Sequence, residues 1–376
     1  MRITNVNNTL DPLTGGGTAQ RTFQMSRALA KAGVSCTILT TDASLDNERQ
    51  RQLGGARIVS CRSIWPRYFV PRFSLGKIER VVAQTDVIHL MGHWSVLNAI
   101  AYLLARRVKK PYVVCPAGAL PIYGRSKLLK GLYNQIVGRR LIRDARFCIA
   151  VTPAEIPAFE SYGVERGKIR VIPNGIAVED IPAPDPQAFR ARHGLGTAPI
   201  ILFVGRLNHI KGPDLLLQAF SNLSDALHGY QLVFVGPDGG MLGALQEMAA
   251  RHTMGNRVRF LGFLGGAEKY QAYFASTLLV VPSRQEAMSI VVLEAGITGT
   301  PVLLTDQCGF DDVAHCRGGE VVGASVAGLE QGLLRLLGDP SALKQMGAAL
   351  KSFVKGRYAW EGLLPTYVAL YRDCLS

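Results

Sequence analysis

The stretch Ser283–Thr305, SRQEAMSIVVLEAGITGTPVLLT, decides the fold that we expect for this chain. It follows an apolar, strand-like run, changes from a polar loop into an amphipathic helical pattern, and ends in a second apolar run after Gly299 and Pro301. A strand, a loop and a helix N-terminus form the arrangement that binds phosphate groups through unpaired backbone N–H groups. The stretch therefore predicts a strand–helix–strand unit with an anion site where its helix begins.

Two carboxylates in this stretch, Glu286 and Glu294, stand eight positions apart. On a helix this spacing corresponds to an axial rise of about 12 Å. The pair therefore predicts contact with two ends of one elongated ligand whose phosphates lie between them. The alternative for such a pair is an ordinary capped core helix with two solvated carboxylates.

Strand and helix patterns alternate along the 376 residues, which predicts an α/β protein with two doubly wound, Rossmann-like parallel domains. We expect an N-terminal domain over residues 1–182, with the C-terminal helix over 358–376 packing back on it, and a second domain over 183–357. The segment 179–194 contains three prolines and is the predicted linker. Ligands are expected outside the carboxyl ends of the strands, and the linker should place the two domains facing each other across a cleft.

The positive charge is confined to the first part of the chain. Residues 1–150 hold 23 Lys and Arg against 7 Asp and Glu, a net charge of +16, whereas residues 151–376 hold 19 against 21, a net charge of −2. A one-sided basic domain indicates an anionic partner, which could be nucleic acid, acidic lipid or a phosphorylated substrate. No aromatic stacking strand of the RNP type is visible, so nucleic acid is not expected as a partner.

Residues 125–146 predict a basic amphipathic helix or helix pair. Such a segment either docks on an anionic membrane surface or covers the domain with a solvated basic face. The seven cysteines are scattered without a C-x-x-C pair, and residues 1–6 read as a strand rather than as a signal peptide. These features predict a reducing, cytoplasmic location, with peripheral contact of the basic N-terminal domain with the anionic inner face of the cell membrane.

The N-terminal strand is followed by a predicted loop over 10–17 that holds Gly15, Gly16 and Gly17, and then by a helix. The dinucleotide fingerprint G-x-G-x-x-G is absent, so a dinucleotide cofactor is not expected. Three glycines ahead of a helix let the backbone approach a ligand closely, although a plain turn would use the same residues.

At this point the sequence resembles a family, the retaining glycosyltransferases of the GT-B fold, family 4, also called glycosyltransferase group 1. The resemblance covers nearly the whole chain. Its carriers are the segments 171–176 (VIPNGI), 203–206 (FVGR) with 211–212 (KG), 235–239 (VGPDG), 258–262 (VRFLG), and the E-x7-E helix that runs into 299–302 (GTPV).

In such enzymes a nucleotide sugar loses its diphosphate, and a positive site must meet the charge that develops there. Arg206 and Lys211 fit this task, the first as a bidentate fork and the second as a point charge. The resemblance implies that Glu286 holds sugar hydroxyls and that Glu294 holds the ribose. The predicted catalytic residues are therefore Arg206, Lys211 and Glu286.

The resemblance also implies a set of backbone contacts to the donor. Gly16 and Gly17 match a glycine pair that lies beside the phosphates when the cleft closes, and the amides at the helix start would bind the phosphates. Base contacts would come from backbone near Gly236 and residues 263–264. The predicted donor-binding residues are Gly16, Gly17, Gly205, Gly236, Phe263, Leu264, Ala287, Met288, Ser289, Ile290 and Glu294.

One position departs from the family pattern. Many relatives carry His before Gly in the loop that corresponds to residues 116–120, where that His meets the donor sugar, whereas this chain has Ala117 before Gly118. Either this branch does without the contact, or His93 or another group supplies it, or the activity is weak. Ala117, Gly118 and His93 are the candidates on the acceptor and sugar side, and His93 and His89 could equally be core or cleft-wall histidines.

The resemblance implies transfer of a sugar from a UDP- or GDP-sugar to a saccharide or lipid-linked saccharide acceptor, in cell-surface polysaccharide or glycolipid synthesis. No D-x-D motif stands in a suitable loop, so we expect no metal and no cofactor. The alternatives are a nucleotide-sugar 2-epimerase of the same architecture and a non-catalytic relative that binds nucleotide sugars.

Overall fold

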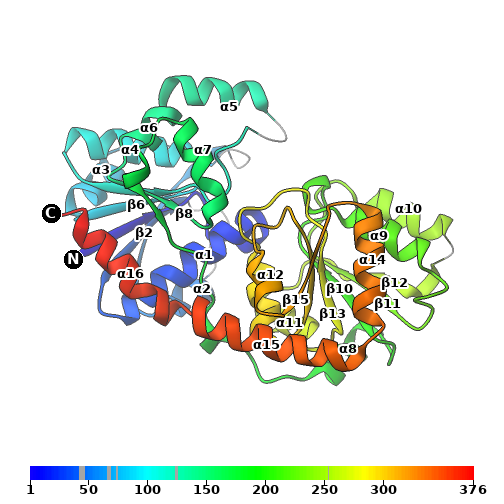
Figure 1. The fold of residues 1–376 in the computed structure, drawn as a ribbon. Coiled ribbons are helices and arrows are strands. Elements are labelled where there is room, and N and C mark those ends of the chain that lie inside the picture. The colour runs from blue at the N-terminus through cyan, green and yellow to red at the C-terminus, as the bar shows by residue number, and fades with distance from the viewer. Residues whose placement is uncertain (42–46, 66–68, 73–74, 123–125, 253) are drawn as a thin grey trace. The chain divides into compact units, whose positions relative to one another are not determined.

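The computed structural model of the chain describes residues 1–41, 47–65, 69–72, 75–122, 126–252 and 254–376. These residues form two compact units, drawn in Figure 1. Unit 1 comprises Met1–Gly175 and Trp360–Ser376, and unit 2 comprises Ile176–Ala359. The boundary between the units thus lies seven residues before the predicted one at residue 182.

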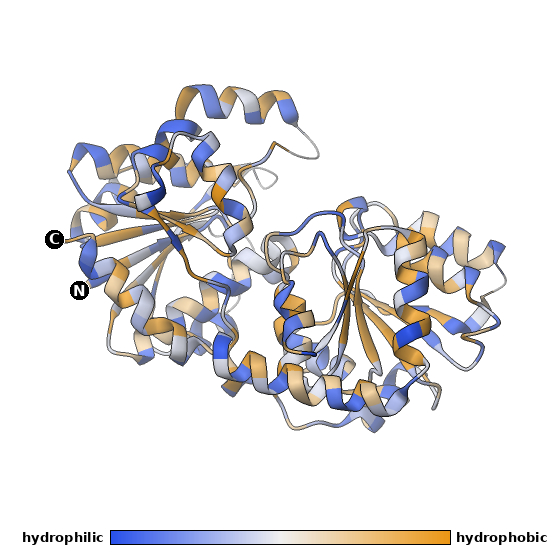
Figure 2. Ribbon diagram, viewed as in Figure 1, coloured by the Kyte–Doolittle hydropathy of each residue, from blue (hydrophilic) through white to orange (hydrophobic). Residues whose placement is uncertain are grey.

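Unit 1 is built on a seven-stranded parallel sheet with the order β3-β2-β1-β6-β7-β8-β9. Its central strands are short apolar runs that are buried on both faces, as expected for parallel strands between helical layers (Figure 2). The strands are β1 (Arg2–Val6), β2 (Ser35–Thr41), β3 (Arg57–Cys61), β6 (Val87–Met91), β7 (Tyr112–Cys115), β8 (Phe147–Ala150) and β9 (Ile169–Val171). A separate two-stranded hairpin pairs β4 (Ser63–Trp65) with β5 (Val70–Pro71).

Helices cover both faces of this sheet, and Figure 1 shows α3, α4, α6 and α7 on one side and α1 and α16 on the other. The bounds are α1 (Pro12–Lys31), α2 (Asn47–Gln52), α3 (Leu75–Gln84), α4 (Val96–Arg107), α5 (Lys127–Tyr133), α6 (Arg139–Arg143), α7 (Ile156–Ser161) and α16 (Trp360–Asp373). A π-helical turn, η1 (Asn134–Gly138), joins α5 and α6 without a break. The predicted basic segment is therefore one continuous helical stretch.

The predicted loop over residues 10–17 is wrong, because α1 already begins at Pro12. The side chain of Asp11 accepts hydrogen bonds from the N–H groups of Leu13 and Thr14, which is the usual way to cap a helix that starts with proline. Gly16 then interrupts the helix with a φ of 55° and a ψ of −140°. This backbone conformation favours glycine, so the sequence of three glycines marks a break inside a helix.

The C-terminal helix α16 belongs to unit 1 and is joined to it by buried polar contacts. The Trp360 indole N–H donates to Gln24 Oε1 at 3.1 Å, and Arg21 Nη2 donates to the Tyr367 hydroxyl at 2.7 Å. The Tyr371 hydroxyl lies 2.8 Å from His89 Nδ1. His89 is fully buried here, so it is a core histidine.

Unit 2 is built on a six-stranded parallel sheet with the order β12-β11-β10-β13-β14-β15. The strands are β10 (Ile200–Val204), β11 (Gln231–Val235), β12 (Val258–Phe260), β13 (Leu278–Val281), β14 (Val302–Thr305) and β15 (Gly319–Val322). The helices are α8 (Pro186–His193), α9 (Pro213–Asn222), α10 (Leu242–Arg251), α11 (Gly266–Phe274), α12 (Ile290–Thr298), α13 (Asp312–His315), α14 (Val326–Leu337) and α15 (Pro340–Tyr358). The order reverses between β10 and β13, so the predicted doubly wound α/β fold is confirmed.

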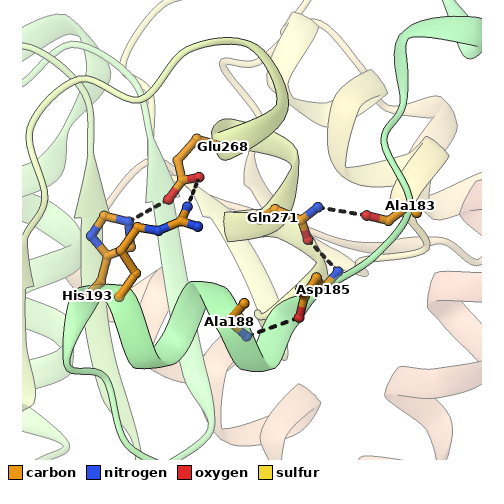
Figure 3. Close-up of polar contacts among 7 residues, drawn as sticks. Ala183, Asp185, Ala188, His193, Glu268 and Gln271 are labelled. Carbon is orange, nitrogen blue, oxygen red and sulfur yellow. Dashed lines mark hydrogen bonds and ion pairs between the residues drawn. The ribbon is translucent and has the colours of Figure 1, made fainter.

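The predicted linker over residues 179–194 is wrong, because this segment packs within unit 2 and contains α8 (Figure 3). Asp185 caps α8 by accepting from the N–H of Ala188 at 3.1 Å. Gln271 on α11 bonds to Ala183 O and to Asp185 N–H, both at 2.7 Å. Glu268, one turn earlier on α11, bonds to His193 at 2.8 Å, so both ends of the segment are fixed to α11 (Figure 3).

Candidate functional site

The loops that follow β10 and β13 lie side by side in unit 2, at the point where the strand order reverses. The N–H of Arg284 donates to Ile210 O at 2.7 Å, and its guanidinium donates to His209 O at 2.8 Å. The same guanidinium pairs with Asp214, at the start of α9, at 2.6 Å. Ligands of doubly wound proteins bind at this position, so the two loops form the candidate site.

A glycine lets these two loops approach each other. A Cβ atom on Gly212 would lie 2.0 Å from the carbonyl oxygen of Pro282, and Gly212 has a φ of 65°. Both the space and the backbone conformation therefore require glycine. This close approach brings Lys211 to the loop that carries Glu286.

Lys211 and Glu286 form an ion pair, with 2.5 Å between Lys211 Nζ and Glu286 Oε1. The Ser283 hydroxyl donates to the same oxygen at 2.7 Å, and the backbone N–H of Glu286 donates to Gln307 O at 2.8 Å. The side chain of Glu286 is 9% exposed, whereas that of Lys211 is 33% exposed. Two side chains therefore hold the carboxylate and a third bond holds its backbone, while the ammonium stays accessible to a ligand.

The N-terminus of α12 follows Glu286 closely in the sequence. Its N-cap residue is Ser289, whose side chain makes no capping hydrogen bond. The Ser289 hydroxyl is buried and has no hydrogen-bond partner among the described residues. The first N–H groups of a helix have no partner within the helix, so this end of α12 can accept an anion.

Arg206 and the loop after β11 complete this edge of unit 2. The N–H of Leu207 donates to Pro237 O at 3.0 Å, and a Cβ on Gly239 would lie 2.8 Å from Cγ of Arg206. Arg206 is exposed, and its Cγ packs against Gly239. Arg206 and Lys211 both belong to the loop between β10 and α9.

Gly236, near which a base contact is predicted, packs against two other loops. Its N–H donates to Gly262 O at 2.7 Å, and a Cβ on it would lie 1.9 Å from the carbonyl oxygen of Gly205. Gly236 is therefore required for the packing of three loops, and its N–H is already used. Phe263, which follows β12, is 44% exposed and leaves an apolar ring available to a ligand.

Glu294, the predicted ribose contact, is buried within unit 2. Its side chain is 2% exposed. Lys269 Nζ lies 2.5 Å from Oε1, and the Tyr273 hydroxyl donates to Oε2 at 2.8 Å. The side chain of Lys269 is 21% exposed, so it covers this carboxylate from the solvent side.

Lys269 and Tyr273 were not predicted from the sequence. They stand four residues apart on α11, so both side chains lie on one face of that helix. One feature of the sequence pointed to such partners. The residues around Glu294 in α12 are apolar and buried, and a buried carboxylate requires a partner for its charge. The two contacts of α11 with the α8 segment orient the helix that supplies this partner.

The candidates from unit 1 are placed in and beside its core. His93 is 1% exposed, its Nε2 lies 2.9 Å from Asn134 Oδ1, and its ring contacts Trp94, Tyr133 and Tyr162. The suggestion that His93 replaces the missing family histidine is therefore wrong for this conformation, because its ring has no surface for a ligand.

Ala117 adopts a φ of 48°, which is unusual for a residue with a Cβ atom. The loop is held by Glu155, a residue that the sequence did not indicate. Its two oxygens accept hydrogen bonds from the N–H groups of Gly118 at 2.5 Å and of Val151 at 2.6 Å. Burial raises the pKa of Glu155, and these two bonds oppose that effect. Ala117 and Gly118 themselves remain partly exposed.

The buried His93 predicts a loss of stability in mild acid. Burial lowers the pKa of His93 to about 4, whereas the unfolded chain binds the proton near its ordinary value of 6.5. The contribution to the free energy of unfolding is therefore complete above pH 6.5 and decreases as pH falls toward 4, by up to about 3 kcal/mol. Denaturant unfolding of the wild type across this window should reveal the slope.

The matched variant is His93→Gln, which keeps a donor toward Asn134 but does not titrate. Its free energy of unfolding should depend less on pH than that of the wild type, while His252→Gln, at an exposed histidine, should leave the dependence unchanged. Equal pH slopes in wild type and His93→Gln would contradict the assignment.

The chemistry of the unit 2 site suits one class of ligand. Two cationic side chains and an open helix N-terminus bind the oxygens of a diphosphate, and a fixed carboxylate accepts hydrogen bonds from hydroxyl groups.

Two family models match the chain. The model described as Glycosyl transferases group 1 matches residues 185–353, and the model described as Glycosyl transferase 4-like domain matches residues 16–175. The D-inositol 3-phosphate glycosyltransferase of Nocardia farcinica is 32% identical over 303 residues, which cover 76% of this chain and 66% of that protein. The protein of the same name from Frankia alni is 30% identical over 310 residues, which cover 77% of this chain and 75% of that protein.

Solved structures share the fold across the whole chain. Anabaena Alr3699/HepE in complex with UDP superposes with a TM-score of 0.80 at 17% identity, covering 99% of this chain and 100% of that chain. Sucrose-phosphate synthase from Thermosynechococcus elongatus superposes with a TM-score of 0.78 at 21% identity, covering 99% and 98%. Together with the matched domains, these likenesses show that the chain belongs to the group 1 glycosyltransferases and has the GT-B fold.

Proposed function

We propose that the protein is a retaining, metal-independent glycosyltransferase that takes a sugar from a UDP- or GDP-sugar. The observation that carries this proposal is the ion pair of Lys211 with Glu286, on two loops bonded together at the strand reversal and next to the open N-terminus of α12. Such a site would bind a diphosphate and a sugar at adjacent positions. The structure of Anabaena Alr3699/HepE with UDP-glucose supports UDP as the donor nucleotide.

In the proposed reaction, the bond between the anomeric carbon and the donor phosphate oxygen breaks, and the diphosphate gains negative charge. Arg206, Lys211 and the first N–H groups of α12 stabilise that charge, so the chain supplies the positive charge that a metal would otherwise provide. The acceptor hydroxyl attacks the same face of the sugar and its proton passes to the leaving phosphate oxygen. Glu286 orients the sugar through its hydroxyl groups, and Lys211 moves from Glu286 toward the phosphate when the donor binds.

The donor nucleoside is proposed to bind along the edge formed by the loops after β11 and β12. Phe263 offers an exposed apolar ring, and Glu294 accepts the ribose hydroxyls after Lys269 has been displaced. The unit 1 residues Gly16, Gly17, Ala117 and Gly118 remain proposed contacts on the phosphate and sugar side.

Two acceptor classes agree with the basic charge of residues 1–150. The first is a saccharide or lipid-linked saccharide at the cytoplasmic face of the membrane, in cell-surface polysaccharide or glycolipid synthesis. The second is a small phosphorylated polyol, which the name of the relatives, D-inositol 3-phosphate glycosyltransferase, favours. The phosphate of the polyol, or the anionic membrane that holds a lipid-linked saccharide, would face this basic surface.

The test is a turnover assay of purified protein with UDP- and GDP-sugars, offered with either acceptor class and with none. The proposal expects a glycosylated product with the anomeric configuration of the donor, formed equally well with a chelator present. A change at C2 of the donor sugar without acceptor would instead identify an epimerase. Donor binding without turnover of any acceptor would identify a non-catalytic relative, and an inverted product would contradict the proposed mechanism.

A further inference from the structure

The helical stretch over residues 126–143 carries a stripe of apolar side chains that are exposed and not packed in the core of unit 1. The exposed fractions are 90% for Leu128, 56% for Leu129, 53% for Leu132 and 65% for Ile136. Residues 128, 132 and 136 recur every four positions, so they lie on one side of the helix. We call these four residues the α5 face.

The position of α5 explains why this face stays uncovered within unit 1. No residue of α5 is buried. Figure 1 shows α5 outside the layer of helices that covers the sheet, and Figure 2 shows apolar and polar residues alternating along it. The helix is attached through η1 and α6, where Asn134, Leu141 and Ile142 are buried. A stripe of large aliphatic side chains kept on a protruding helix indicates an interaction surface.

The charged side chains of the helical stretch that carries the α5 face are all positive. Residues 126–143 contain five basic side chains and no acidic one. Lys127 and Arg140 are exposed near the two ends of the stripe, whereas Lys130 and Arg139 lie over the rings of Trp94 and Tyr162. A stripe of leucine and isoleucine between lysine and arginine is the pattern of a helix that lies in a membrane interface, with its apolar side in the acyl region.

We propose that the α5 face docks unit 1 on the surface of an anionic lipid bilayer, with Leu128, Leu132 and Ile136 inserted and Lys127 and Arg140 at the headgroups. An anionic bilayer fits both observations at once, because it offers an apolar phase below a layer of negative charge. A nucleic acid would use the charge but not the aliphatic stripe. In the described part of the chain no helix has the length and apolarity that crossing a bilayer requires, so the contact is at the surface. The proposal concerns where the protein is held and is independent of the proposed transfer reaction.

Co-sedimentation of the full chain with vesicles tests the proposal. Wild type should bind vesicles of phosphatidylcholine mixed with phosphatidylglycerol, bind phosphatidylcholine alone weakly, and lose affinity as salt is raised. Replacing both Leu128 and Leu132 by Gln should lower the partition coefficient at least about tenfold. Replacing both Lys127 and Arg140 by Gln should lower it about 25-fold, because each basic residue contributes about fivefold.

The matched control is Leu334→Gln, at a leucine of α14 in unit 2 that is 47% exposed, and it should bind vesicles like wild type. All four replaced residues of the α5 stretch are exposed, so the variants should keep the wild-type melting temperature. The proposal is overturned if wild type does not bind the anionic vesicles at low salt, or if Leu334→Gln loses as much affinity as the leucine pair. It is also overturned if sedimentation shows that the leucine variant abolishes a wild-type dimer while vesicle binding is unchanged.

Discussion

Replacing Lys211 by Met is expected to reduce sugar transfer by about 10²- to 10³-fold, the effect of removing one preorganised group that stabilises developing charge. The ammonium lies at the end of a loop that is fixed by Gly212 and Arg284, so its position is set by the fold. Steady-state kinetics with a nucleotide sugar should show the loss in kcat. Lys355→Met, at an exposed lysine of α15, is the matched control and should retain wild-type turnover.

The same pair also predicts a coupling in stability. Lys211→Met leaves a carboxylate of 9% exposure without its cation, and Glu286→Gln removes that charge. The double variant should therefore be more stable than the sum of the single changes implies, by about 0.5–3 kcal/mol. Turnover should stay low in all three variants. Full turnover in Lys211→Met would contradict its catalytic role, and additive stabilities would contradict the ion pair.

Replacing Glu294 by Ala is expected to lower the free energy of unfolding by about 3–5 kcal/mol, the cost of breaking a buried ion pair by removing one partner. Lys269 and Tyr273 both lose their acceptor in this variant. Denaturant unfolding measures the effect. Glu247→Ala, at an exposed glutamate of α10, should change the stability by less than about 0.5 kcal/mol.

A second comparison separates the charge of Glu294 from its hydrogen bonds. Glu294→Gln keeps an acceptor for the Tyr273 hydroxyl and should destabilise unit 2 less than Glu294→Ala does. Tyr273→Phe should lower the free energy of unfolding by about 1–3 kcal/mol, because one buried carboxylate oxygen then has no hydrogen-bond donor. If Glu294→Ala has the same denaturation midpoint as the wild type, the buried ion pair with Lys269 contributes nothing to the stability of the fold. Activity lost in Glu294 variants should therefore be read together with their stability.

The strands of both units were the part of the fold that the sequence predicted best. Their apolar runs predict strands over residues 57–61, 200–204, 231–235 and 258–260, and the structure has strands with these bounds. Strands of a parallel sheet that is covered on both faces are short apolar runs, so their ends coincide with the change in composition.

Helix starts were harder to predict where proline and glycine are dense. Asp11-Pro12 and Asp185-Pro186 are both N-cap pairs, but the glycines after the first and the prolines before the second suggested a loop and a linker. The segment before α8 is fixed in unit 2 by side chains of α11, about 80 residues further on, and no local pattern indicates such contacts.

Within the site, the pairing of Lys211 with Glu286 agrees with the prediction that these residues lie close together, because each follows one of two adjacent strands. The environment of Glu294 could not be predicted in the same way. Its partners come from α11, and the choice of partner depends on how α11 packs against α12. The environment of His93 could not be predicted either, since its Nε2 is hydrogen-bonded to Asn134 in the π-helical turn.

Calorimetric titration of UDP and UMP into wild type and Lys211→Met tests the central claim most directly, because the two nucleotides differ by one phosphate. We expect wild type to bind UDP more tightly than UMP, and Lys211→Met to lose at least about tenfold in affinity for UDP while its affinity for UMP is unchanged. GDP and GMP serve as the second pair should the donor be a GDP-sugar. Equal affinity of Lys211→Met and wild type for the diphosphate, or no binding of either diphosphate, would contradict a diphosphate site formed by Lys211 and the N-terminus of α12.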